Sequence, residues 1–132
     1  MKTILVIDDN AMMRLFLENF LGKTYEIVAV ETPTKAISLH DEGFVPQMIL
    51  ADYHPKTSKE VTALNALSKQ MNWQDSPLFI LTDDDKSEQR INALTLGSKD
   101  TMSKPFNPKE LMMRMESIMA TTPVYSTLRK VA

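Results

Sequence analysis

The sequence predicts an α/β fold in which a parallel sheet is covered by helices on both faces. Short apolar runs alternate five times with amphipathic stretches along the 132 residues. Such alternation favours parallel strands joined by right-handed helical crossovers. The apolar runs are nearly continuous, as expected of strands that are buried on both faces. The length fits one domain with a sizeable core.

The first strand is expected at residues 4–7, a run of apolar side chains that ends at two aspartates. In the helix that follows, apolar side chains are spaced three, one, three and one residues apart, which places them on one stripe: Met13, Phe16, Leu17, Phe20 and Leu21. Asn10 suits the N-cap of this helix, and Gly22 suits its end.

The next elements repeat the order of strand and helix. Residues 25–30 form the second expected strand, and residues 33–41 form a helix with Pro33 in its first turn. Gly43 ends that helix. Residues 48–51 are the third expected strand, and this strand also runs into an aspartate.

The second half of the chain continues the alternation. We expect a helix at residues 58–71, a strand at 78–81 and a helix at 86–96. A short, weak strand at 101–103 and a last helix at about 108–120 complete the pattern.

Polar side chains follow four of the predicted strands, at the point where each strand ends. They are Asp8, Asp9, Asp52, Thr82 and Lys104. Ligands of such sheets bind outside the carboxyl ends of the strands, so these side chains are expected to converge. Two like charges about 4 Å apart cost roughly 4 kcal/mol at an effective dielectric near 20. The trio of carboxylates therefore favours a bound hard cation, Mg²⁺ or Mn²⁺.

Carboxylate, divalent ion, ammonium and hydroxyl together suit phosphoryl transfer. In this order, each after its own strand, the residues resemble the receiver domain of two-component response regulators. The resemblance extends over about residues 3–119 and rests on Asp8-Asp9, Asp52, Thr82 and Lys104-Pro105-Phe106. It implies a flavodoxin-like, three-layer fold with a five-stranded parallel sheet of order 2-1-3-4-5 and five flanking helices.

The resemblance also implies a role for each residue of the metal site. Asp52 would be the phosphoacceptor. Asp9, Asp52 and the main-chain carbonyl of His54 would bind the ion directly, and Asp8 would act mainly through metal-bound water. The loop that contains His54 departs from the family pattern, however, and the imidazole itself is expected to be a solvated loop side chain.

Further residues would handle the phosphoryl group. By resemblance, Lys104 would contact its oxygens, Thr82 would hydrogen-bond them, and a cis-linked Pro105 would aim Lys104. Two positions depart from the family. Thr101 stands where an aromatic side chain is common, and Asp83 stands where a small residue is usual.

We expect Asp83 to slow self-phosphorylation by small donors such as acetyl phosphate. Asp83 and Asp84 begin an acidic run that ends at Asp85. This run fits either the first turn of a helix, which its dipole favours, or a second metal site.

Several apolar residues are expected to be exposed. Met12 and Leu15 lie off the stripe of the first helix, where family members dock a histidine-bearing phosphodonor. In the last helix, Leu111, Met115 and Ile118 make the predicted core stripe. Met112 and Met119 lie off it and are interpreted as facing a partner, on the output face of the fourth helix, fifth strand and fifth helix.

Composition excludes other classes of protein. The net charge of −2 gives no basic excess for nucleic acid, and the absence of cysteine excludes a disulfide framework. No apolar stretch approaches the ~20 residues that cross a bilayer, so a cytoplasmic protein is expected. We divide the chain into a receiver domain, residues 1–120, and a tail or linker, residues 121–132.

Three hypotheses follow. The first is a switch that is phosphorylated on Asp52 by a histidine kinase or phosphotransfer protein. It catalyses only its own phosphorylation and dephosphorylation and is not a turnover enzyme. The second is a degenerate receiver that only binds partners, and the third is an unrelated flavodoxin-like enzyme or nucleotide binder. No glycine-rich phosphate loop supports the third. The off-stripe methionines fit a homodimer and a hetero-partner equally well.

Overall fold

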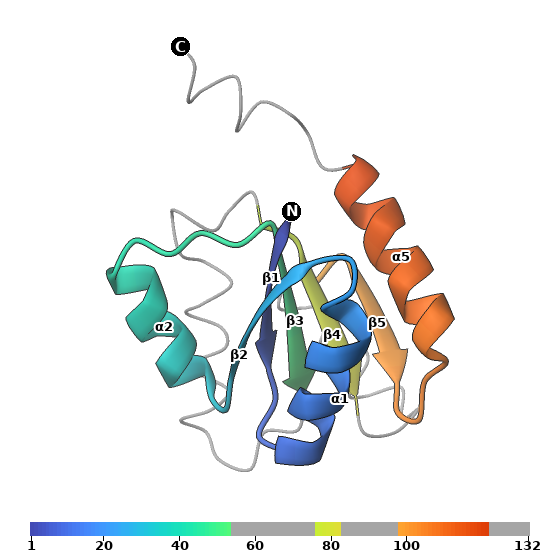
Figure 1. Ribbon diagram of the computed structural model, residues 1–132, viewed down its shortest axis with the longest axis horizontal. Helices are drawn as coiled ribbons and strands as arrows, with labels where there is room; N and C mark the ends of the chain where they lie inside the picture. Colours follow the sequence, from blue (N-terminus) through green and yellow to red (C-terminus); the bar gives the residue numbers. More distant parts are fainter. Residues whose placement is uncertain (54–75, 83–97, 122–132) are drawn as a thin grey trace.

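A five-stranded parallel sheet forms the centre of the molecule (Figure 1). The computed structural model describes residues 1–53, 76–82 and 98–121. The strand order is β2-β1-β3-β4-β5, as predicted. The bounds are β1 Thr3–Ile7, β2 Glu26–Val30, β3 Met48–Tyr53, β4 Leu78–Thr82 and β5 Asp100–Ser103.

Helices cover both faces of the sheet, so the predicted three layers are confirmed (Figure 1). The helices in the described ranges are α1 Ala11–Leu21, α2 Pro33–Asp41 and α5 Pro108–Thr121. Side chains of α1 and α5 share one core cluster with Ile4 and Val6 of β1. Ala36 of α2 shares the other cluster with Leu5 and Ile7 of β1. Successive residues of β1 thus point to opposite faces, as the pleat of a strand requires.

The start of α1 follows the prediction, and one side chain of its core stripe does not. Asn10 caps the helix, with its side-chain oxygen accepting from the Met13 N–H at 2.9 Å. Leu17 and Leu21 are fully buried. Phe16 was expected in the core but is 40% exposed. It lies at the margin of the stripe, where the helix surface turns away from the sheet.

Local capping explains the bounds of α2. The hydroxyl of Thr32 accepts from the Lys35 N–H at 3.2 Å, and Pro33 fills the first turn. Gly43 follows the helix with φ 92°, in the left-handed region that glycine adopts at low cost.

The last helix confirms its predicted core stripe, and two further methionines lie at the edge of that stripe. Leu111 and Met115 are fully buried, and Ile118 packs against the same cluster. Met112 and Met119 also pack against that cluster and are partly buried, so they belong to the edge of the core, and a contact of their exposed part with a partner stays a prediction. The apolar stripe of α5 is therefore wider than the spacing of Leu111, Met115 and Ile118 predicted.

Parts of the prediction lie outside the described residues. These are the helices expected at residues 58–71 and 86–96, and the tail beyond Thr121. Within the residues that are described, no helix combines the length and the apolar character that a membrane span requires.

Candidate functional site

The carboxyl ends of β1 and β3 bring three carboxylates together. The strands are neighbours, and Ile7 pairs with Ala51 in the ladder, so the next residue of each strand begins the site. Carboxylate oxygens of Asp8, Asp9 and Asp52 lie within 4.8 Å of one another. The side chains of Asp8 and Asp52 are only 1% and 5% exposed, whereas Asp9 is exposed to solvent. The convergence predicted from the ends of the strands is confirmed for this trio.

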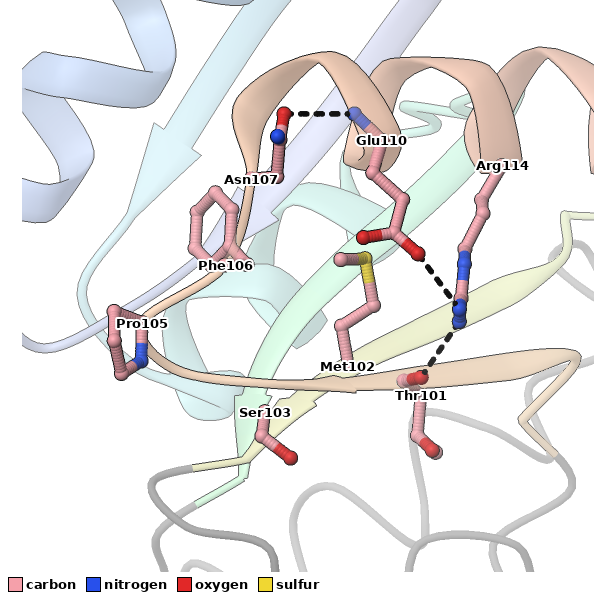
Figure 2. A pocket seen from close by; sticks show the side chains of 8 residues that line it. All are labelled: Thr101, Met102, Ser103, Pro105, Phe106, Asn107, Glu110 and Arg114. Atoms are coloured by element: carbon pink, nitrogen blue, oxygen red, sulfur yellow. Dashed lines mark hydrogen bonds and ion pairs between the residues drawn. The ribbon is translucent and has the colours of Figure 1, made fainter.

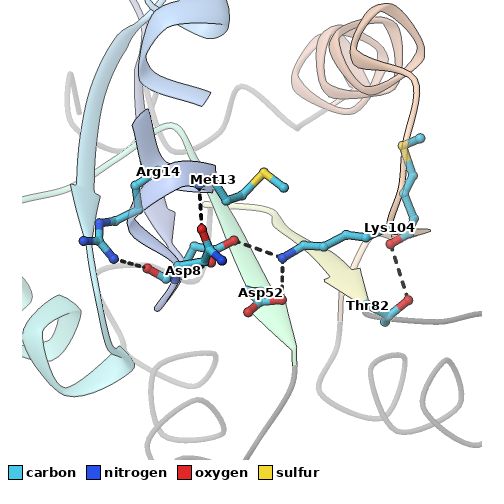
Figure 3. A network of polar contacts seen from close by, with 8 residues as sticks. Asp8, Met13, Arg14, Asp52, Thr82 and Lys104 are labelled. Carbon is cyan, nitrogen blue, oxygen red and sulfur yellow. Dashed lines mark hydrogen bonds and ion pairs between the residues drawn. The ribbon is translucent and has the colours of Figure 1, made fainter. Parts of the chain in front are cut away.

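Asp8 is held by contacts to its main chain as well as to its carboxylate (Figure 3). Its N–H donates to the Val30 carbonyl of β2 at 3.1 Å. Its Oδ1 accepts from the Asn10 N–H at 2.9 Å. Its carbonyl accepts from Nη1 of Arg14, in the first turn of α1, at 2.8 Å. Buried polar groups need such partners, and here they fix the orientation of Asp8.

Lys104 bridges two of the three carboxylates. Its Nζ lies 3.1 Å from Oδ2 of Asp8 and 3.0 Å from Oδ1 of Asp52 (Figure 3). The Lys104 N–H donates to the Thr82 carbonyl at 2.8 Å, which fixes the backbone of the loop against the end of β4. The peptide bond between Lys104 and Pro105 is cis, as predicted.

The surroundings of Lys104 favour its charged form. Burial lowers the pKa of Lys104, but the hydrogen bonds and charges of Asp52 and Asp8 outweigh this effect, so the pKa is raised above its usual value. The ammonium is therefore a permanent positive charge at neutral pH.

Thr82 ends β4 beside this network. Its side chain is buried, and its hydroxyl donates to the Met102 carbonyl of β5 at 3.4 Å. The hydroxyl is thus directed towards β5 in this structure, and contact with a phosphoryl group stays a prediction.

The donor set fits the predicted divalent cation. All three side chains offer carboxylate oxygens, the ligands that Mg²⁺ and Mn²⁺ prefer. The ammonium of Lys104 between Asp8 and Asp52 shows that this rim accepts a cation. The remaining predicted site residues, His54, Asp83 and Asp84, lie outside the described part of the chain.

Thr101 lines a pocket of about 260 Å³ beside β5 and the start of α5 (Figure 2). Arg114 joins the two elements there. Its guanidinium donates to the Thr101 carbonyl at 3.3 Å, to Asp100 at 3.3 Å and to Glu110 at 3.0 Å. The Thr101 N–H donates in turn to Asp100 at 2.8 Å. The N–H and C=O of Thr101 are therefore satisfied by charged side chains.

Sequence reasoning missed Arg14 and Arg114. Each is a long side chain on a helix: Arg14 reaches back to the residue just after β1, and Arg114 reaches back to β5. For Arg14, the available signal was a basic residue in the first helical turn after an Asp-Asp pair. For Arg114, the signal was Glu110 four residues earlier, the spacing of a helical ion pair.

Comparison with known proteins agrees with this geometry. Residues 4–116 match the family model of the response regulator receiver domain. The phosphate regulon transcriptional regulatory protein PhoB of Pseudomonas aeruginosa is 28% identical over 122 residues, 92% of this chain and 53% of that protein. Histidine kinase P4 of Formosa agariphila is 26% identical over 118 residues, 89% of this chain and 8% of that protein. The chain thus spans about half the length of the first relative and a small part of the second.

A solved structure shows the same fold. The crystal structure of a putative response regulator from Chloroflexus aurantiacus superposes with a TM-score of 0.80 at 24% identity, over 90% of this chain and 98% of that one. The matched family model includes the strands that place Asp8, Asp9, Asp52, Thr82 and Lys104 at one edge. The chain belongs to the response regulator receiver domain family.

Proposed function

We propose that the chain is a phosphorylation-dependent switch in a two-component system. It accepts a phosphoryl group on Asp52 from the phosphohistidine of a histidine kinase or phosphotransfer protein. Asp9, Asp52 and the main-chain carbonyl of His54 would hold Mg²⁺ directly, Asp8 would act mainly through water, and Mn²⁺ would serve as a substitute. The observation that supports this most directly is the convergence of three carboxylates with the ammonium of Lys104.

The proposed reaction uses residues that lie within contact of one another. A carboxylate oxygen of Asp52 attacks the phosphorus, and the bond from phosphorus to the donor histidine nitrogen breaks with its electron pair. Lys104 moves from the carboxylates to the phosphoryl oxygens, and the Thr82 hydroxyl turns from the Met102 carbonyl towards them. Mg²⁺ held at the carboxylate trio would supply positive charge that stabilises the transferring phosphoryl group. The protein catalyses only its own phosphorylation and dephosphorylation and is not a turnover enzyme.

Exposed apolar residues support a docking site for the phosphodonor. Met12 is 74% exposed and Leu15 is 52% exposed, and both lie on α1 just after the aspartates. We propose that the phosphodonor covers them and that an output partner reads the face of the fourth helix, β5 and α5. The output partner is a further domain, a separate protein or a second copy of the chain. We also propose that the protein acts in the cytoplasm. This domain does not itself bind nucleic acid.

A second candidate function is a receiver that binds partners without being phosphorylated. Thr101 favours it, because a threonine at this position lacks the apolar area of the aromatic side chain that commonly couples the site to the output face. Asp83 favours the partner-binding receiver as well, because by resemblance it stands beside the phosphoryl position, where a small residue is usual.

Intact-protein mass spectrometry separates the two functions. The protein is incubated with Mg²⁺ and a phosphorylated histidine phosphotransfer protein, alongside Asp52→Asn and the matched control Asp41→Asn, which alters an exposed carboxylate at the end of α2. We expect one added phosphoryl group in the wild type and in Asp41→Asn, and none in Asp52→Asn. An unmodified wild type would favour the partner-binding receiver.

A further inference from the structure

Arg14 contacts the loop between β1 and α1, which carries Asp8 and Asp9, from the side opposite Lys104 (Figure 3). Its Nη1 donates to the carbonyl of Asp8 at 2.8 Å, and its side chain is partly buried. Lys104 approaches the carboxylate of the same aspartate at 3.1 Å. Arg14 therefore contacts the main chain between the two aspartates, whereas Lys104 neutralises a side chain.

The carbonyl that Arg14 binds belongs to the peptide group joining Asp8 to Asp9. A peptide group is planar, so holding its oxygen fixes the direction in which the chain continues to the Asp9 Cα atom. Asp8 has further anchors in its N–H and Oδ1. The solvent-exposed Asp9 follows this peptide directly and belongs to the carboxylate trio.

We propose that Arg14 is a positioning residue for the cation site, which it serves by fixing the Asp8–Asp9 peptide so that the Asp9 carboxylate stays aimed at the other two. This inference rests on the proposed Mg²⁺ site. Residues that orient metal ligands without touching the metal typically change its affinity 10- to 100-fold when mutated. A cation beside the site would by itself repel Mg²⁺, so a purely electrostatic role and a positioning role predict opposite effects of removing Arg14.

The test compares Arg14→Met, which removes the donor but keeps an unbranched side chain, with Arg14→Lys, which restores a charged donor. Lys23→Met is the matched control, since it removes one positive charge from an exposed position just after the other end of α1. Titration calorimetry at fixed ionic strength gives the Kd for Mg²⁺ in each protein. ¹⁵N relaxation in the metal-free proteins gives the order parameter of the Asp9 amide, which reports its motion on the ps–ns timescale.

We expect the Kd of Arg14→Met to rise about tenfold, with a lower Asp9 order parameter. Arg14→Lys should recover part of the affinity, and Lys23→Met should match the wild type. A Kd for Arg14→Met equal to or below that of the wild type, or an unchanged Asp9 order parameter, would overturn the inference. A wild type that binds no Mg²⁺ would instead refute the proposed metal site, and the order parameter of Asp9 would still decide whether Arg14 fixes the peptide.

Discussion

Lys104 supplies positive charge to the carboxylates of Asp8 and Asp52 when no metal is bound. The carboxylates that it bridges are almost completely buried, and removing one partner of a buried ion pair leaves the other charges uncompensated. We predict that Lys104→Met lowers the free energy of unfolding by about 3 kcal/mol in EDTA. Added Mg²⁺ should recover most of this loss, because it supplies positive charge to the same carboxylates. Urea unfolding with and without Mg²⁺ measures both effects.

Lys35→Met provides the control for this prediction. Lys35 forms an exposed ion pair with Glu31 at 3.4 Å, and such pairs contribute no more than about 1 kcal/mol. Its removal should change stability little, to the same extent with and without Mg²⁺. If Lys104→Met were as mild as Lys35→Met in EDTA, solvent rather than the ammonium would be compensating the buried carboxylates.

Replacing Gly43 by alanine tests whether the backbone conformation of this one residue determines where α2 ends. Its φ of 92° lies in the left-handed region, and open space surrounds the position of an added Cβ. Gly43→Ala should therefore cost about 1 kcal/mol through conformation alone. Glu42→Ala, at the preceding residue with φ −84°, should be nearly neutral. Thermal unfolding of both variants measures the difference, and equal stabilities would show that the turn relaxes to another conformation.

At the scale of elements, aromatic contacts join α1 to the loop that carries Lys104. The Phe16 ring stacks on Phe20, with centroids 5.9 Å apart, and meets the Phe106 ring at 6.5 Å. Phe106 lies two residues after Lys104, so the half-exposed Phe16 links the middle of α1 to the loop after β5. Aromatic pairs contribute about 0.5–1.5 kcal/mol beyond the area that they bury.

A double-mutant cycle measures this link between the elements. We predict that Phe16→Ala and Phe106→Ala are coupled in their effects on unfolding by about 0.5–1.5 kcal/mol. The matched cycle pairs Phe16 with Phe44, which packs against the core cluster that contains Ala36 of α2. That cycle should be additive within about 0.5 kcal/mol. Additivity of the Phe16 and Phe106 changes would mean that the ring contact does not join the two elements.

At the scale of the whole molecule, two kinds of feature could be predicted from the sequence: the strands, from hydrophobic periodicity, and the position of the site, from the residues at which the strands end. Continuous apolar runs identified the strands, and the rule for parallel sheets brought Asp8, Asp9 and Asp52 to one edge. Spacing alone did not predict how far a helix face is covered, which is why Phe16 proved half-exposed and Met112 partly buried. Nor does sequence show where a long side chain reaches, so the contact of Arg14 with the Asp8 carbonyl appeared only in three dimensions.

The carboxylate trio also predicts how the whole molecule responds to metal. Asp8 and Asp9 come from the loop between β1 and α1, and Asp52 comes from β3, so the site exists only when the chain is folded. A ligand that binds only the folded state raises the free energy of unfolding by RT ln(1 + [L]/Kd), about 2.7 kcal/mol at one hundred times Kd. For a domain of this size the midpoint of thermal unfolding should rise on the order of 10 °C.

Asp9→Asn removes one carboxylate of the trio at an exposed position, so its metal-free stability should stay close to that of the wild type. Its midpoint should rise much less with Mg²⁺, because the remaining ligands bind the ion more weakly. Glu18→Gln, an exposed carboxylate on α1, should respond to Mg²⁺ as the wild type does. Differential scanning calorimetry across a Mg²⁺ titration separates these cases. An equal rise in all three proteins would mean that the ion acts by general screening of an acidic chain, and the magnesium site would have to be abandoned.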